Sequence, residues 1–208
     1  MSLIITFENI TEADRQRIGG KGYALSLMAR TGAKVPPGVC VSADAYRQYL
    51  KRTGLADRIR MELSRKPFVD MRWEEIWDAA LRIRNMFLTT PLPQPLYHAI
   101  SGPLLQRFGD TAVVVRSSAP DEDSNRASFA GMHESYVNIK GNEAIVDHVG
   151  LVWASLWSDA AILYRRELGL DVSKSSMAVV VQGDSGVGIP ALPHPFRGAD
   201  TLSRCRMV

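Results

Sequence analysis

Hydrophobic positions in this chain follow two different periods, which separate predicted strands from predicted helices. Short apolar or alternating runs predict strands at residues 3–7, 39–41, 112–115, 135–139 and 177–181. Apolar residues at three- and four-residue steps predict helices at residues 23–30, 43–50, 55–65, 73–88, 95–108, 142–156 and 159–168. No segment repeats elsewhere in the chain, so a repeat architecture is not indicated.

Two of the helices and the end of the chain carry finer predictions. The prediction of a helix at 73–88 depends on residues that recur at three- and four-residue steps, namely Trp73, Ile76, Trp77, Ala80, Ile83, Arg84 and Phe87. Gly102-Pro103 is expected to kink or split the helix at 95–108, because proline removes a backbone hydrogen bond. Residues 183–208 are rich in glycine and proline with little periodicity, which predicts an irregular or disordered tail.

Aromatic and basic residues on the later helices are assigned by their residue type. Trp153 and Trp157 are expected in the core, because tryptophan buries a large apolar area. Arg165 and Arg166 are assigned to a solvated helix face. These assignments give none of the four residues a catalytic role.

Composition gives no support for nucleic-acid binding, metal binding or membrane contact. The 208 residues carry a net charge of only +3, with no basic run interleaved with aromatics, so nucleic-acid binding is not indicated. The two cysteines form no CxxC motif and the four histidines are scattered, so no metal-ligand spacing is present. No signal peptide and no apolar run approaching roughly 20 residues is found, which predicts a cytoplasmic protein without membrane contact.

The turn Gly19-Gly20-Lys21-Gly22 is the first candidate for chemistry. Glycines let a backbone approach a ligand closely, Lys21 supplies a mobile positive charge, and the helix that follows offers exposed N–H groups to an anion. The sequence is neither a Walker A loop nor a GxGxxG motif. Taken alone, the motif favours the alternative, a plain glycine-rich helix entry with a solvated lysine.

The segment Val113–Ala119 is the second candidate. A buried strand ends in Arg116 and two serines, and the guanidinium fork can hold phosphate oxygens. The alternative is an arginine that caps the strand or pairs with the acids at 121–123. Those acids suit either Mg²⁺ or a solvated loop.

Two smaller motifs follow along the chain. Residues 128–131 suit a flap over a nucleotide or an ordinary glycine turn built around Phe129. Gln182, at the end of the strand at 177–181, has an amide that fits an adenine edge, although a strand-end glutamine by itself indicates little.

Taken in order, the segments IGGKGYALSLMARTGAKVPPGVCVS (18–42), VVVRSSAPDEDSNRASFAGMHESYVNIKG (113–141), VWASLWSDAAILYRRELGL (152–170) and MAVVVQ (177–182) resemble the nucleotide-binding domain of the phosphoenolpyruvate synthase and pyruvate phosphate dikinase family. Rifampicin phosphotransferases share that domain. The resemblance spans roughly residues 3–182, and the ordered set is far more specific than any one motif.

The resemblance implies an α+β fold of the ATP-grasp type, in which two lobes hold ATP between them. The first lobe, with a helical insertion, would span residues 1–110, the start of the second would span 111–182, and 183–208 would form an atypical tail. By position, Lys21 and Arg116 would bind the phosphates and act in catalysis, so that the two motifs form halves of one triphosphate site. Gly131 and Ser135 would belong to the covering loop and Gln182 to the adenine side.

The resemblance also implies a reaction in which ATP is split and a phosphoryl group passes to a histidine on a separate domain, then to pyruvate or to rifampicin. No histidine of this chain lies in such an acceptor motif, and the region expected to supply the Mg²⁺ ligands is missing after residue 182. We therefore expect a truncated ATP-binding portion that is inactive alone. The alternatives are one chain of a split enzyme, with a partner that supplies the histidine, and a non-catalytic remnant or regulatory nucleotide-binding module.

Overall fold

The computed structural model describes residues 2–120 and 134–184 of the chain. At its centre, the described residues form a five-stranded sheet whose strand pairs are all antiparallel. The strands are β1 (Ile4–Thr6), β2 (Gly38–Val41), β3 (Val113–Ser118), β4 (Ser135–Ile139) and β5 (Ala178–Gly183), in the spatial order β1-β2-β5-β3-β4. The last strand in sequence therefore lies in the middle of the sheet.

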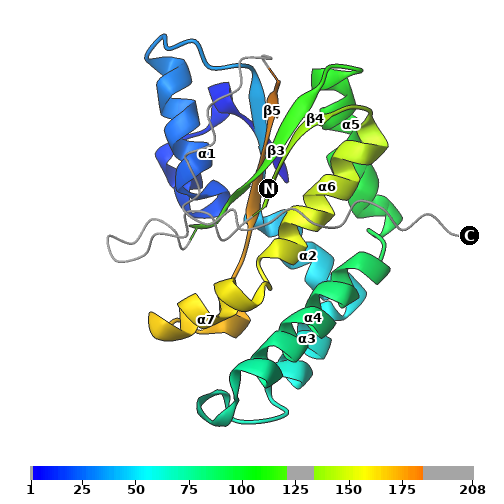
Figure 1. Cartoon of the computed structure of the whole chain (residues 1–208). Helices are drawn as coiled ribbons and strands as arrows, with labels where there is room; N and C mark the ends of the chain where they lie inside the picture. The colour runs from blue at the N-terminus through cyan, green and yellow to red at the C-terminus, as the bar shows by residue number, and fades with distance from the viewer. Residues whose placement is uncertain (1, 121–133, 185–208) are drawn as a thin grey trace, which may run out of the picture.

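Helices cover both faces of this sheet. Helix α1 (Arg15–Arg30) lies on one face, while α5 (Gln94–Phe108) and α6 (Asn142–Ser155) lie on the other (Figure 1). The remaining helices, α2 (Ala43–Thr53), α3 (Leu55–Leu63), α4 (Trp73–Thr89) and α7 (Asp159–Glu167), extend from the same end of the sheet. Short 3₁₀ turns η1 (Phe7–Asn9), η2 (Glu12–Asp14), η3 (Phe68–Asp70) and η5 (Val172–Lys174) connect these elements.

Strand register divides the core into two clusters, because directly paired residues of an antiparallel sheet project from the same face. Val115 and its partner Val181 belong to the larger cluster, beneath the helices opposite α1. Val180 belongs to the smaller cluster, together with Ile18 of α1. Arg116 pairs with Val180 and therefore projects from the α1 face.

The structure confirms all five predicted strands and each predicted helix, with differences at the ends. Helix α1 begins at Arg15, eight residues before the predicted start, and β3 continues through Ser118 instead of ending at Val115. Helix α5 runs unbroken from Gln94 to Phe108, so Pro103 does not split it, and the other expected outcome, a kink at this residue, stays a prediction. Ile100, Leu104 and Phe108 are buried in the larger core, and this packing holds the helix together across the proline.

Side-chain burial confirms one expectation and corrects another. Trp153 and Trp157 are in the core as predicted, whereas Trp73 and Trp77 of α4 are 58% and 47% exposed. Arg165 is 1% exposed, not solvated, and its Nη1 donates to the Leu156 carbonyl oxygen at 2.7 Å. It lies one turn after the buried Ala161, on the inward face of α7, which explains its burial.

Mixed helices and an antiparallel sheet confirm the α+β class. The single sheet takes β1 and β2 from residues before 110 and β3 to β5 from residues after it. The larger core likewise contains residues from both stretches. The strands assigned to the two expected lobes therefore share one sheet in this structure. None of the described helices has the length and apolarity needed to cross a membrane.

Candidate functional site

The glycine-lysine turn lies at a break in helix α1. Gly19 has φ +73° and ψ 168°, which is not helical, and the helix resumes at Gly20. A Cβ atom on Gly19 would lie 2.6 Å from the carbonyl oxygen of Ser118, so only glycine allows this approach. Lys21 is exposed in the first turn after the break. The segment predicted as a turn is thus a helix entry with one non-helical residue.

Ser118 joins this helix entry to the end of β3. Its hydroxyl donates to the Ile18 carbonyl oxygen at 2.6 Å and accepts a hydrogen bond from the Gly22 backbone N–H at 3.1 Å. Ser118 is fully buried. Two segments that lie 96 to 100 residues apart in sequence therefore meet directly, and the two motifs singled out from the sequence occupy one place in the fold.

Arg116 lies two residues before Ser118 on the same face of β3, because side chains alternate along a strand. It pairs with Val180 of β5 on one side and with Ser135 of β4 on the other. Its Nε atom is buried and has no hydrogen-bond partner among the described residues. A buried N–H group without a partner is destabilising, so this position favours an acceptor that the described residues do not supply.

The other predicted site residues divide into three cases. Ser135 is exposed and lies directly opposite Arg116 in the β3–β4 pair. Gln182 is 5% exposed, pairs with Val114 of β3, and its Nε2 donates to the Pro36 carbonyl oxygen at 3.2 Å. Ser135 and Gln182 thus share the α1 face with Arg116. Gly131, the acids at 121–123 and residues 128–130 lie outside the described residues.

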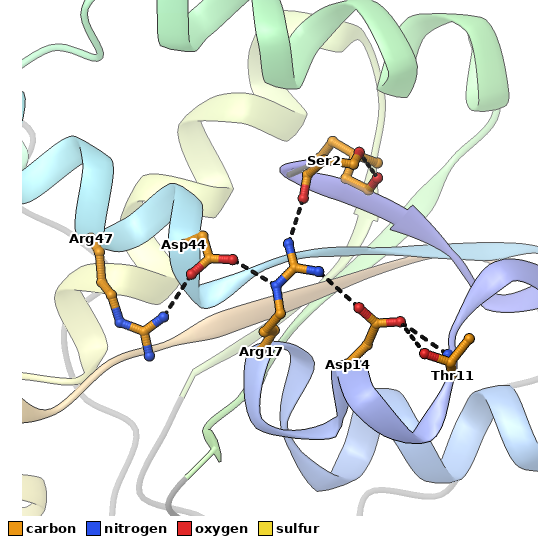
Figure 2. A network of polar contacts seen from close by, with 7 residues as sticks. Ser2, Thr11, Asp14, Arg17, Asp44 and Arg47 are labelled. Carbon is orange, nitrogen blue, oxygen red and sulfur yellow. Dashed lines mark hydrogen bonds and ion pairs between the residues drawn. The ribbon is translucent and has the colours of Figure 1, made fainter.

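A polar network anchors the chain just before the glycine turn (Figure 2). Arg17 Nε donates to Asp44 Oδ2 at 2.7 Å, and Arg17 Nη1 donates to Asp14 Oδ1 at 2.8 Å. Thr11 donates to the other Asp14 oxygen through both its backbone N–H and its hydroxyl. Arg47 completes the network with a 2.8 Å contact to Asp44. The network ties the start of α1 to the start of α2.

The electrostatics of this network follow from its contacts. Burial raises the pKa of Asp14, but the hydrogen bonds from Thr11 and Arg17 outweigh burial, and the net shift is downward. Burial also raises the pKa of Asp44, and the hydrogen bond and charge of Arg17, with a smaller contribution from Arg47, again make the net shift downward. Both carboxylates are therefore ionised at neutral pH, which keeps the anchor charged on both sides.

The helix entry also rests on Cys40 of β2. A Cβ atom on Gly22 would lie 2.7 Å from Cys40 Sγ, so α1 passes closely over the sheet at this point as well. Burial raises the pKa of the Cys40 thiol to about 12, which makes it an inert packing group at neutral pH. Close packing against β2 and β3 thus fixes the height of the Lys21 segment above the sheet.

A known protein family matches most of the chain. The pattern of the pyruvate phosphate dikinase AMP/ATP-binding domain matches residues 15–185, from the first residue of α1 to just beyond β5. The chain belongs to this family. The matched residues, 15–185, include both the glycine-lysine segment and the strand of Arg116.

Individual proteins similar to this chain have names that are consistent with the family. A phosphoenolpyruvate synthase of Aeropyrum pernix is 38% identical over 207 residues, covering 95% of this chain and 25% of the relative. A probable phosphoenolpyruvate synthase of Methanocaldococcus jannaschii is 38% identical over 187 residues, covering 88% and 16%. A rifampicin phosphotransferase of a Streptomyces species is 36% identical over 181 residues, covering 86% and 21%. The chain thus spans a quarter or less of the length of these relatives.

A nucleotide fits this site better than a metal ion does. Arg116 Nε has no hydrogen-bond partner among the described residues, and α1 approaches Ser118 closely at a glycine. Both features suit an anionic ligand, as expected of an AMP/ATP-binding domain. In residues 2–120 and 134–184, no group of three or more His, Cys, Asp or Glu side chains is arranged to hold a metal ion.

Sequence reasoning missed the residues that position the site. In the sequence, Ser118 stands out only as part of the motif around Arg116, and no local pattern indicates its contacts with Ile18 and Gly22. The Thr11–Asp14 spacing is typical of a capping box, so that half of the anchor was detectable. The Arg17–Asp44 pair joins residues 27 positions apart, and no periodicity predicts it.

Proposed function

We propose that this chain binds ATP on the α1 face of its sheet, with Lys21 and Arg116 contacting the phosphates from opposite sides. The observation that best supports this site is the direct contact that Ser118 makes between the glycine-lysine entry of α1 and the end of β3. It brings the Lys21 segment beside the strand of Arg116, whose Nε has no hydrogen-bond partner among the described residues. Family membership supports a nucleotide as the anion that neutralises Lys21 and Arg116.

The remaining contacts of the proposed site follow from the sheet register. Ser135, opposite Arg116, is proposed to contact the nucleotide together with Gly131, which lies outside the described residues. Gln182 is proposed on the adenine side, and its hydrogen bond to Pro36 would hold its amide in one orientation. We further propose that the whole arrangement is of the ATP-grasp type, with lobes at 1–110 and 111–182 that contribute strands to one sheet, and an atypical tail at 183–208 whose first residue, Gly183, ends β5.

The chemistry proposed is phosphoryl transfer from ATP, which supplies the phosphoryl group when bound. Transfer of this kind depends mainly on positioning and charge neutralisation, and Lys21 and Arg116 would provide both. The group would pass to a histidine on a separate domain or chain and then to pyruvate, and the relatives named as phosphoenolpyruvate synthases support pyruvate as the final acceptor. The Streptomyces relative supports rifampicin as the alternative acceptor.

Calorimetric titration with ATP tests the binding site. We expect wild-type protein to bind ATP, and Lys21→Ala and Arg116→Ala each to weaken binding by at least about tenfold, since a charge-assisted contact is worth roughly 1.5–3 kcal/mol. Lys51→Ala is the matched control, because Lys51 is an exposed lysine on α2 and its loss changes the net charge equally. Equal affinity in all four proteins would refute the assignment of the site.

A second experiment separates the proposed phosphotransferase from a nucleotide-binding remnant. The chain is incubated with ATP and a separately produced phosphohistidine domain of a phosphoenolpyruvate synthase, and the mass of that domain is followed. A gain of one phosphoryl group supports transfer, whereas ATP binding without any gain supports a regulatory binding module. If ATP does not raise the thermal midpoint at all, the chain is a remnant, because a ligand of the folded state stabilises it.

A further inference from the structure

Ser118 occupies a position that neither the motif nor the proposed ligand set explains. It is the last residue of β3, it is fully buried, and its hydroxyl is used twice: as a donor to Ile18 and as an acceptor from Gly22. These two backbone groups lie on either side of the segment that carries Lys21. The hydroxyl therefore spans the helix break from one end to the other.

This bridge constrains the break in a specific way. Gly19, inside it, has a backbone conformation that side chains disfavour, and it lies against the Ser118 carbonyl. Helix α1 is interrupted there, so the usual helical hydrogen bonds do not by themselves fix the position of Gly20 and Lys21. The two Ser118 hydrogen bonds supply that missing constraint, and they supply it from the strand that also carries Arg116.

We infer that Ser118 is a positioning residue that sets the place of Lys21 relative to Arg116 for binding of a triphosphate. This inference rests on the proposed function, because it assumes that both cations contact ATP. Ser118 itself is enclosed by Ile18, Gly19 and Gly22 and does not contact the ligand. Its hydroxyl acts through the backbone on either side of the lysine, and its loss changes phosphate binding without removing a charge.

The test compares two buried serines on the same strand. Ser118→Ala removes both hydrogen bonds, while Ser117→Ala removes a hydroxyl from a residue that is 2% exposed and projects from the opposite face of β3. For each variant, saturation-transfer NMR measures affinity for ATP and for adenosine, which lacks phosphates. Hydrogen exchange of the Gly22 amide reports on the bridge itself, independently of any ligand.

We expect Ser118→Ala to weaken ATP binding about tenfold, to leave adenosine binding unchanged, and to accelerate exchange at Gly22. Ser117→Ala should change neither the affinity ratio nor that exchange rate. Equal loss of ATP and adenosine affinity would show a general structural role and would overturn the inference, as would unchanged ATP affinity in Ser118→Ala. Wild-type protein that binds no ATP would instead refute the proposed function, and the positioning role with it.

Discussion

Substitution of Gly19 by alanine tests the geometry of the candidate site most directly. Gly19 is buried, has φ +73° and ψ 168°, and a Cβ atom there would lie 2.6 to 2.7 Å from three atoms of Ser118. Two of those atoms belong to the backbone of β3, a strand of the sheet interior, so they have little freedom to move. Gly19→Ala must therefore displace the start of α1 or strain it.

The size of the effect follows from two separate contributions. The backbone conformation of Gly19 is nearly confined to glycine and costs a residue with a side chain about 1–3 kcal/mol. Steric overlap in a packed interior adds about 1–3 kcal/mol. The expected loss of unfolding free energy is therefore about 2–6 kcal/mol, a large share of the roughly 5–15 kcal/mol typical of a domain.

Urea unfolding, followed by circular dichroism, measures this loss, and Gly54→Ala is the matched control. Gly54 has φ +72° and ψ 7°, and a Cβ atom there would meet nothing within 4 Å, so only the backbone contribution of about 1–2 kcal/mol applies. Gly19→Ala should also abolish the ATP affinity proposed for the wild type. If Gly19→Ala is no more destabilising than Gly54→Ala, the close approach of α1 to β3 is refuted.

Two further predictions concern charged contacts. Because the folded-state pKa of Asp14 and of Asp44 lies below the ordinary value of 3.8, their stabilisation is complete above that pH and is lost as the pH falls through the lowered pKa. Asp14→Asn should lower the urea midpoint at neutral pH and flatten its decline below about pH 4; an unchanged acid profile would contradict this. Arg82→Leu should destabilise by about 1–3 kcal/mol, since it leaves Glu62, 4% exposed, with the exposed Arg65 as its one remaining ion-pair partner among the described residues. Arg60→Leu, in a mostly exposed pair, should stay within about 0.5 kcal/mol in the same urea assay, and equal losses would refute the distinction.

Local patterns predicted most of the secondary structure correctly, because the residues that indicate a helix or a strand lie within a few positions of one another. The apolar run around Val180 marks β5, and the period of α6 is visible in Ile145, Val149 and Val152. The family resemblance likewise depended on the order of short motifs along the chain, and the comparison with known proteins confirms it.

Local patterns failed where packing decides the outcome. Glycine has low helix propensity, so residues 19–22 indicated a turn, yet close contacts with Ser118 and Cys40 select glycine at Gly19 and Gly22 inside α1. Arginine is usually a solvated residue, but Arg165 lies on the inward face of α7 and is therefore buried in the core. In both cases a tertiary contact outweighed a propensity of about 1 kcal/mol or less per residue.

By itself, the sequence determined which segments are helices and strands, which residue types suit phosphate, and which family the chain belongs to. Only the tertiary structure decided that β5 lies between β2 and β3, that Arg116 projects toward α1, and that Ser118 bridges the helix break beside Lys21. The physical reason is separation along the chain. Periodicity reports on neighbours within a turn or two, whereas the contacts that build the site join residues about a hundred positions apart and form only when the core is packed.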